Sequence, residues 1–333
     1  MLTQKTAARD LDYLEQDDFA KAVRQALSGR KKRLPSKYLY DDRGSALFVE
    51  ITKLPEYYLT NCETEIFRTL SPAIIDCLPD SVDEIVELGC GDGQKTEILL
   101  TSFARRKPGL KFVPVDIHPA SVKKIGTRIS SALPDVEVSG YVGDYFAYLN
   151  EKPPIPDHAR LFLFLGSNIG NFDPDEAVHF LCKLHDLLDQ EDYLLIGMDL
   201  KKEVPVMQAA YDDSQGVTTA FNLNLLHRMN RELDADFDPG SFYHHACYNA
   251  ELGAMQSFLL SRKTQDVHLA ALGMTVHFDL LEALHVENSF KYSFQDIHAL
   301  AQRAGFHVVE NFLDSKAYFT DSLWRKKPKP CQV

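Results

Sequence analysis

Short apolar runs alternate with amphipathic stretches through the middle of the chain. The runs cover residues 85–88, 112–116, 136–142, 160–165 and 193–198. Apolar residues recur at helical spacing between the runs, for example over residues 174–188. Later in the chain, residues 306–312 and 317–325 form two apolar stretches that predict an antiparallel hairpin. Strands that alternate with helices predict an α/β fold built on a Rossmann-like, parallel and doubly wound sheet.

Two long stretches depart from this alternation. Residues 11–60 precede the first strand–helix unit, and residues 201–286 separate the alternating region from its final hairpin. The second stretch begins with helical periodicity and continues with strand-like runs, so it is predicted to be α+β. We therefore predict two discontinuous domains. Residues 61–200 and 287–333 form the sheet domain, and the two irregular stretches together form a substrate-binding domain.

The first apolar run leads into a glycine-rich turn. Glu87 is followed by Gly89, Gly91 and Gly93, and a helical pattern begins directly after them. Glycine lets the backbone approach a ligand closely, and the N–H groups at a helix start favour carboxylates or phosphates. A phosphate-binding loop or a dinucleotide fingerprint would need glycine where the chain has Gln94. The spacing instead resembles the first motif of S-adenosylmethionine (SAM) methyltransferases.

Acidic residues follow the next two apolar runs. Asp116 ends the second run, roughly 20 residues beyond the glycines, where a carboxylate can accept both ribose hydroxyls. Asp144, followed by Tyr145, comes after the third run, where methyltransferases commonly contact the adenine amino group. Either acid could instead cap a helix or form a turn. Because the motifs follow one another at successive strand ends, the interpretation as a SAM site is favoured.

Polar and aromatic residues suited to a small substrate lie in several segments. The fourth run ends at Gly166 and continues into a turn with Asn171, whose side chain can both donate and accept hydrogen bonds. Open α/β sheets bind ligands beyond the carboxyl ends of their strands. Tyr40 and Tyr57 precede the sheet domain, and Tyr211 ends a helical stretch. These residues could line a pocket, or they could serve only packing and helix capping.

A carboxylate and a hydroxyl alternate where the long internal stretch returns to the sheet domain. In a strand, Glu287 and Ser289 point to the same face. The pair could hold a ring that carries two nitrogens. A solvent-facing polar stripe would show the same spacing.

Composition and charge narrow the function. The 333 residues carry a net charge of −12, which argues against a nucleic acid as the main substrate. None of the six cysteines forms a C-x-x-C pair, so no metal site is expected. We expect no membrane span, because no apolar run reaches about 18 residues. The first ten residues lack the apolar core of a signal peptide, so a cytoplasmic location is expected.

Taken together, the motifs resemble the histidine-specific SAM-dependent methyltransferase family over nearly the whole chain. The motifs that carry the resemblance cover residues 40–45, 54–58, 87–89, 95–96, 166–172, 210–213 and 287–289. The resemblance implies Nα-methylation of L-histidine by successive transfers to the trimethylated product, hercynine, in ergothioneine biosynthesis. It also implies a class I SAM-methyltransferase sheet, SAM as the cofactor and a monomeric protein.

The resemblance implies a role for each matching position. Tyr57, Asn171 and Tyr211 would hold the amino-acid head group, and Gly166 would also bind the substrate. Tyr40 would lie in the pocket near the imidazole. The residues implied to be catalytic are Tyr40, Tyr57, Asn171 and Tyr211. Glu287 and Ser289 would hold the imidazole. The residues implied to bind SAM are Glu87, Gly89, Gly91, Gly93, Lys95, Thr96, Asp116, Asp144 and Tyr145.

Two other functions stay open at this point. One is N-methylation of another aromatic amino acid, such as a tryptophan derivative, although a large apolar indole gains little from the Glu287–Ser289 pair. The other is a SAM-binding regulatory subunit without catalysis.

Overall fold

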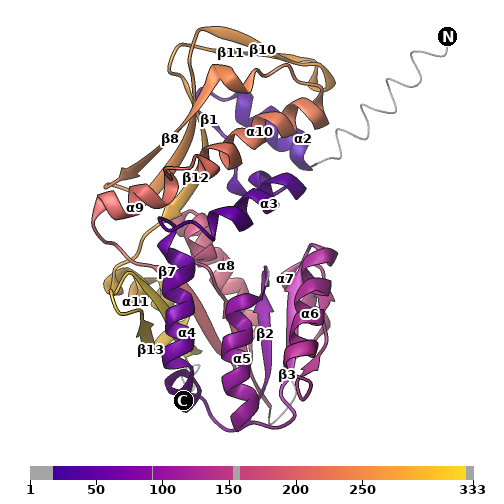
Figure 1. Cartoon of the computed structure of the whole chain (residues 1–333), viewed down its shortest axis with the longest axis vertical. Helices are drawn as coiled ribbons and strands as arrows, with labels where there is room; N and C mark the ends of the chain where they lie inside the picture. Colours follow the sequence, from indigo (N-terminus) through magenta and orange to yellow (C-terminus); the bar gives the residue numbers. More distant parts are fainter. Residues whose placement is uncertain (1–17, 92, 153–157, 328–333) are drawn as a thin grey trace, which may run out of the picture. The chain divides into compact units, whose positions relative to one another are not determined.

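The computed structural model describes residues 18–91, 93–152 and 158–327, and the chain divides into two compact units (Figure 1). The sheet unit comprises Leu59–Lys202 and the chain from Phe290 onward. The insert unit comprises the chain up to Tyr58 together with Glu203–Ser289. Residues 11–17 and 328–333 of the predicted domains lie outside the described residues.

A mixed sheet runs through the sheet unit in the order β13–β14–β7–β6–β2–β3–β4, and β5 also pairs with β3. The strands are β2 (Val82–Leu88), β3 (Lys111–Asp116), β4 (Glu137–Val138), β5 (Tyr141–Val142), β6 (Ala159–Phe164), β7 (Tyr193–Asp199), β13 (Phe306–Leu313) and β14 (Phe319–Lys326). β2 is parallel to β3 and β6, and β6 is parallel to β7. β14 runs antiparallel to both β7 and β13.

The predicted α/β fold is confirmed, including the parallel core and the late hairpin. Every residue of β6 and β7 is buried, which explains their nearly unbroken apolar sequences. The prediction of one continuous strand over residues 136–142 is wrong. The structure has two short strands there, and the break falls at Ser139 and Gly140, because glycine weakens a strand interior.

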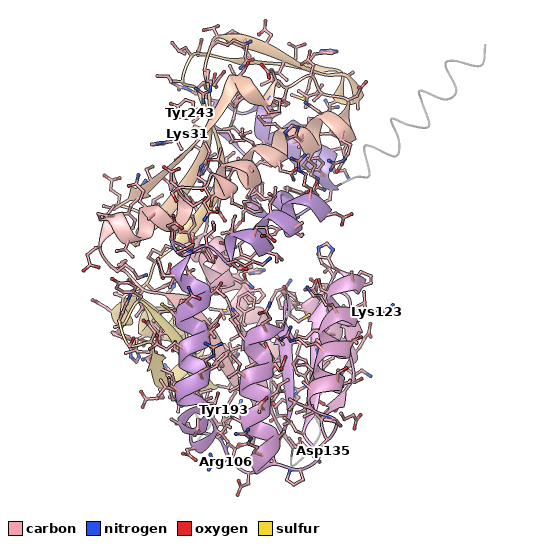
Figure 2. All side chains as sticks on the ribbon, in the orientation of Figure 1. Lys31, Arg106, Lys123, Asp135, Tyr193 and Tyr243 are labelled. Atoms are coloured by element: carbon pink, nitrogen blue, oxygen red, sulfur yellow. The ribbon has the colours of Figure 1, made fainter. Side chains whose placement is uncertain are left out.

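Helices run alongside these strands in Figure 1. They are α4 (Tyr58–Asp76), α5 (Gln94–Arg106), α6 (Pro119–Ala132), α7 (Tyr145–Glu151), α8 (Pro174–Leu187) and α11 (Phe294–Arg303), with the 3₁₀ turn η2 (Asn168–Asn171). Asp173 and Glu176 form a capping box at the start of α8, as the sequence favours. Charged side chains such as Arg106, Lys123 and Asp135 are exposed on this unit (Figure 2).

The insert unit is built on a four-stranded sheet in the order β1–β12–β9–β8 and a separate β10–β11 hairpin. The strands are β1 (Lys32–Arg33), β8 (Phe242–Asn249), β9 (Ala254–Ser261), β10 (Gln265–Leu269), β11 (Met274–Phe278) and β12 (Ala283–Phe290). The helices are α2 (Asp18–Ser28), α3 (Asp42–Ile51), α9 (Val204–Tyr211) and α10 (Val217–Leu233), with 3₁₀ turns η1 (Ser36–Leu39), η3 (Pro239–Ser241) and η4 (Ala270–Leu272).

Helices α9 and α10 of the insert unit pack on β8 and β9. This arrangement confirms the predicted α+β character of residues 201–286. Within the described ranges, no helix combines the length and the apolar content that crossing a membrane requires.

Candidate functional site

The glycine-rich turn joins β2 to α5 at the carboxyl edge of the parallel strands. Gly89, Gly91 and Gly93 all have positive φ, at 79°, 52° and 69°. Residues with a side chain rarely adopt positive φ angles, so the turn depends on glycine at all three positions. The N–H of Gly89 donates to the Val115 carbonyl over 2.9 Å, which ties the turn to the end of β3.

The surroundings of the three glycines differ, and the difference marks the open side of the turn. A Cβ at Gly89 would lie 2.8 Å from the Tyr145 hydroxyl, and one at Gly93 would lie 2.4 Å from the Ile125 side chain. A Cβ at Gly91 would meet no atom of the described residues within 4 Å, its chain neighbours aside. The middle of the turn therefore faces open space, where backbone N–H groups and the start of α5 can contact a ligand.

Glu87 and Thr96 brace this turn from inside the protein. Both side chains are buried, and Thr96 Oγ1 donates to Glu87 Oε1 over 2.7 Å. The bond connects the end of β2 to the first turn of α5 across the glycines. In the structure the two residues thus shape the turn, and their contact with the cofactor stays a prediction.

Lys95 forms an ion pair with Glu63 of α4, a residue that the sequence did not indicate. Glu63 is fully buried, and its Oε1 also accepts from the backbone N–H of Gly166 over 2.7 Å. Burial alone would lower the pKa of Lys95, but the neighbouring Glu63 carboxylate raises it above its usual value. The predicted residues Lys95 and Gly166 are thereby brought together around one carboxylate.

The acids at the next two strand ends stabilise local structure as well. Asp116 Oδ1 accepts from the His118 N–H over 2.9 Å, and Asp144 caps α7 by accepting from the N–H groups of Phe146 and Ala147. Burial raises the pKa of the Tyr145 hydroxyl, and the nearby Asp116 and Asp144 carboxylates add to the shift. Asp116, Asp144 and Tyr145 therefore gather beside the glycine turn, and capping does not prevent carboxylate oxygens from binding a further donor.

The turn after β6 is held tightly in the sheet unit. Ser167 has a φ of 57°, and its Oγ accepts from the Asp199 N–H over 3.0 Å. The Tyr292 hydroxyl donates to the Ile169 carbonyl over 3.3 Å. These contacts fix the turn that ends in Asn171, whose side chain is half-buried. Asn171 thus belongs to the sheet unit, whereas Tyr57 and Tyr211 belong to the insert unit.

In the insert unit, α9 and β12 bring three predicted residues together. The Tyr211 hydroxyl donates to Ser289 Oγ over 2.7 Å, and both side chains are buried. Glu287 is 9% exposed, and its Oε2 accepts from Ser257 Oγ over 3.4 Å. Ser257, on β9, is a further member of this polar cluster, whose residues come from three elements.

An aromatic group borders the polar cluster. The Tyr40 ring lies 5.3 Å from the rings of Phe48 and Phe221, and the Phe48 ring lies 6.1 Å from that of Tyr57. Burial raises the pKa of the Tyr40 hydroxyl well above its usual range, and Glu287, Tyr57 and Tyr211 contribute to the shift. The hydroxyl of Tyr40 is therefore neutral at physiological pH and can donate a hydrogen bond.

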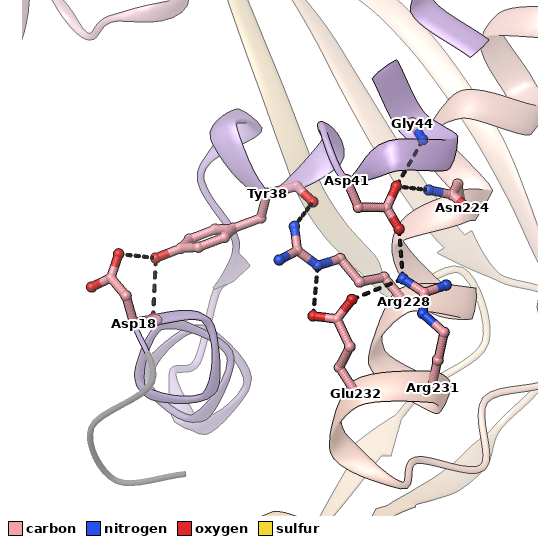
Figure 3. A network of polar contacts seen from close by, with 8 residues as sticks. All are labelled: Asp18, Tyr38, Asp41, Gly44, Asn224, Arg228, Arg231 and Glu232. Carbon is pink, nitrogen blue, oxygen red and sulfur yellow. Dashed lines mark hydrogen bonds and ion pairs between the residues drawn. The ribbon is translucent and has the colours of Figure 1, made fainter. Parts of the chain in front are cut away.

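The segment that follows Tyr40 has its own anchoring network, drawn in Figure 3. Asp41 Oδ1 accepts from the Gly44 N–H and from Asn224 Nδ2, each over 2.7 Å, and Asp41 Oδ2 pairs with Arg231 over 2.6 Å. A Cβ at Gly44 would lie 1.8 Å from the Leu39 carbonyl oxygen, so only glycine fits there. The network fixes the backbone on both sides of Tyr40.

The segment before Tyr57 is anchored by a different contact. Glu56 Oε1 accepts from Ser214 Oγ over 2.7 Å, which links this segment to the turn between α9 and α10. Hydrogen bonds from Ser214 lower the pKa of the Glu56 carboxyl. The segments that carry Tyr57 and Tyr211 are thus held together within the insert unit.

The predicted site residues consequently form two groups. The glycine turn, Lys95, Gly166, Asp116, Asp144 and Tyr145 gather in the sheet unit, and Tyr40, Tyr57, Tyr211, Glu287 and Ser289 gather in the insert unit. The sequence did not predict that Glu63, Phe48 and Phe221 contact the site residues, nor that Ser257 bonds to Glu287. A glutamate in a long helix and two phenylalanines carry no local signal that separates them from ordinary packing. Among the described residues, no three His, Cys, Asp or Glu side chains are arranged to hold a metal ion.

The sequence is similar to those of several known proteins. The model of a family described as histidine-specific, SAM-dependent methyltransferases matches residues 19–326. The chain is 38% identical to a histidine N-alpha-methyltransferase of Mycolicibacterium smegmatis, over 94% of this chain and 97% of that protein. A protein of the same name from Mycobacterium tuberculosis is also 38% identical, over 91% and 94%. Ergothioneine biosynthesis protein 1 of Schizosaccharomyces pombe is 30% identical over 94% of this chain, which covers 41% of that longer protein.

Proposed function

Because the chain belongs to the histidine-specific, SAM-dependent methyltransferase family, we propose that it transfers methyl groups from SAM to the α-amino nitrogen of L-histidine. Successive transfers would give Nα,Nα,Nα-trimethylhistidine (hercynine). The names of the mycobacterial relatives support the substrate and the nitrogen that is methylated. The name of the yeast relative supports a place in ergothioneine biosynthesis.

In this proposal the polar cluster of the insert unit determines the specificity for histidine. A neutral imidazole has one N–H donor and one acceptor nitrogen. Glu287 can accept from the N–H, and the Ser289 hydroxyl can donate to the other nitrogen. The Ser289 oxygen accepts a hydrogen bond from Tyr211, so the proton of the Ser289 hydroxyl has to point to an acceptor other than Tyr211. An indole has a single N–H and no ring acceptor, so it could not accept a hydrogen bond from Ser289 and would forgo about 1 kcal/mol of binding free energy.

The sheet unit fits SAM. The open space at Gly91 accommodates a ligand against the backbone, and the start of α5 suits a carboxylate. In this proposal Lys95 contacts the methionine carboxylate, Asp116 the ribose hydroxyls, and Asp144 with Tyr145 the adenine. When bound, SAM supplies a methyl group that its sulfonium charge already activates. The chain's task is to orient and desolvate the accepting amine.

The α-amino group has to lose a proton before it can accept a methyl group. The α-amino pKa at a peptide terminus is about 8, and the adjacent carboxylate of free histidine raises it further, so most of the substrate is protonated near neutral pH. The raised pKa of Tyr40 makes this hydroxyl a poor base, and Tyr40 instead serves as a donor or packing group. We therefore propose that the proton leaves to water, and that the protein contributes mainly position.

The remaining contacts to the head group are also proposed here. Within the insert unit, Tyr57 and Tyr211 supply hydroxyls to the head group. The insert unit then acts as the substrate-binding domain. Tyrosine faces near the amine would attract the cation that remains after each methylation.

The direct test mixes the purified protein with SAM and equimolar histidine, tryptophan and tyrosine, and follows each amino acid by mass spectrometry. Histidine should gain three methyl groups, while the other two amino acids stay unchanged. Methylation of tryptophan or tyrosine would overturn the roles of Glu287 and Ser289. Absence of any product would contradict the proposed activity.

A further inference from the structure

Three ionisable side chains from distant parts of the sequence meet inside the sheet unit. Glu63 comes from α4, Lys95 from the first turn of α5, and Asp321 from the middle of β14. The side chain of Glu63 and the whole of Asp321 are inaccessible to solvent, whereas the Lys95 side chain is 22% exposed. Lys95 is thus the member of this buried triad that a ligand can reach.

The sheet is shaped to admit the Glu63 carboxylate. A Cβ at Gly197 of β7 would lie 2.4 Å from Glu63 Oε1, so a side chain at this position would displace the carboxylate. The Gly166 N–H donates to the same oxygen over 2.7 Å, and Lys95 pairs with Oε2. A Cβ at Gly166 would lie 3.7 Å from Lys95 Nζ, so the turn after β6 and the ammonium group lie side by side.

Asp321 supplies a second carboxyl next to the first. In the described part of the chain, no donor group bonds to either Asp321 oxygen, and the adjacent polar group is the Glu63 carboxyl. Two buried carboxyls can share a hydrogen bond only if one of them keeps its proton. Burial and the Glu63 charge raise the pKa of Asp321 well above its usual range, which makes Asp321 the protonated partner.

We propose that Glu63 and Asp321 form a positioning pair that carries one negative charge, holds Lys95 charged, and aims its ammonium group at the carboxylate of bound SAM. The inference rests on the proposed role of Lys95 in cofactor binding. One carboxylate, one neutral acid and one ammonium leave the buried triad without net charge, so the three groups compensate one another. Glu87, the other acid that influences Lys95, lies at the end of β2.

Removing the charge of the pair should change how Lys95 responds to pH. Burial lowers the pKa of Lys95, and the nearby carboxylate normally offsets this effect. When the carboxylate is removed, the pKa of Lys95 therefore falls. In Glu63→Gln alone, Asp321 can release its proton but replaces the lost charge only in part, because among the described residues Lys95 pairs with Glu63 and no donor bonds to the Asp321 oxygens. The double variant Glu63→Gln/Asp321→Asn removes both of these charges, and the more weakly acting Glu87 is left to favour the charged lysine. The double variant should therefore be affected more than the single one.

The experiment measures the dissociation constant of S-adenosylhomocysteine by calorimetry between pH 6.5 and 9 for the full-length protein. The double variant should bind at least ten times more weakly than wild type at pH 7.5, and the ratio should grow as the pH rises. Glu63→Gln alone should lose less affinity. A matched control is Asp192→Asn, which breaks the buried pair of Asp192 with Arg160 in the same unit and should leave the pH profile unchanged.

Each outcome decides a definite point. A double variant that binds within twofold of wild type, or that loses the same factor at every pH, overturns the positioning pair. A thermal melt of each variant separates loss of binding from loss of folding. If the double variant is unfolded, the Glu63→Gln variant takes its place in the test. Wild-type affinity and a wild-type pH profile in Glu63→Gln would then overturn the positioning pair. A wild-type protein that binds S-adenosylhomocysteine but does not methylate histidine contradicts only the proposed function, and one that fails to bind it contradicts both.

Discussion

The hydroxyl of Tyr211 donates a hydrogen bond to Ser289 Oγ over 2.7 Å, across 78 positions of the sequence. The bond joins the last residue of α9 to a strand of the insert sheet. It links one residue implied for the head group of the substrate to one implied for the imidazole. The Ser289 hydroxyl is consequently oriented before any substrate arrives, which lowers the entropy cost of binding.

Tyr211→Phe should raise the KM for histidine by roughly fivefold, because one buried hydrogen bond contributes about 1 kcal/mol. The ring and its packing stay in place, so the loss of stability should be limited to this one hydrogen bond, about 1 kcal/mol, and the protein should still fold. Steady-state kinetics at saturating SAM measures the effect. Tyr243→Phe removes a hydroxyl from a half-buried tyrosine on β8 and should leave the KM unchanged. Equal effects of the two substitutions would argue against a role of Tyr211 in orienting Ser289.

Glu287→Gln should weaken histidine binding more strongly. The carboxylate is proposed to accept a hydrogen bond from a ring N–H, and bonds to charged groups contribute about 2 kcal/mol, or roughly thirtyfold in KM. The kcat at saturating histidine and the affinity for S-adenosylhomocysteine should stay close to wild type. Glu282→Gln is a suitable control, because Glu282 lies directly before β12 and pairs with Lys32. An unchanged KM in Glu287→Gln would refute the assignment of this residue to the imidazole.

Gly44→Ala should destabilise the protein. The added methyl would lie 1.8 Å from the Leu39 carbonyl oxygen, and backbone atoms cannot yield as a side chain would. Overpacking of this kind costs about 1–3 kcal/mol and would shift the backbone on both sides of Tyr40. The melting temperature should fall, and the KM for histidine should rise.

Gly126→Ala is the control for Gly44→Ala, because here the added methyl group has room. Gly126 lies inside α6, where the nearest atom to an added Cβ is 3.8 Å away. Alanine in a helix interior is favoured over glycine by about 0.5–1 kcal/mol, so this variant should melt at a higher temperature. A Gly44→Ala protein as stable as wild type would contradict the steric argument.

His244 should make the fold sensitive to acid. Burial lowers the pKa of this histidine to about 4, partly opposed by the carboxylate of Asp212. The folded state therefore favours neutral His244, and the associated stability is complete above pH 6.5 and lost as the pH falls toward 4. The loss amounts to about 3 kcal/mol.

Urea unfolding of His244→Leu at pH 7.5 and at pH 4.5 measures this contribution. The stability difference between the two pH values should shrink relative to wild type, because the unfolded variant no longer takes up that proton. Phe242→Leu, a buried change on the same strand, should lower stability at both pH values without altering the difference. A His244→Leu protein with the wild-type pH dependence would disprove the assignment.

Local patterns in the sequence determined much of the sheet unit. The apolar runs placed the central strands, and the glycine spacing placed the turn between β2 and α5, because both depend on residues close together in the chain. The hairpin of β13 and β14 also followed from its own residues. The break between β4 and β5 was missed, because the apolar residues on either side of Gly140 obscure the weakening effect of this glycine on the strand.

The sequence by itself thus determined the α/β architecture, the glycine turn and the acids at strand ends, since each is encoded within a few neighbouring residues. Only the tertiary structure decided that Glu63 pairs with Lys95 and accepts from Gly166, 103 positions away, and that Tyr211 meets Ser289. Such contacts depend on how whole helices and strands pack. A buried glutamate in α4 looks like any helical residue until Gly197 is seen to leave room for its carboxylate.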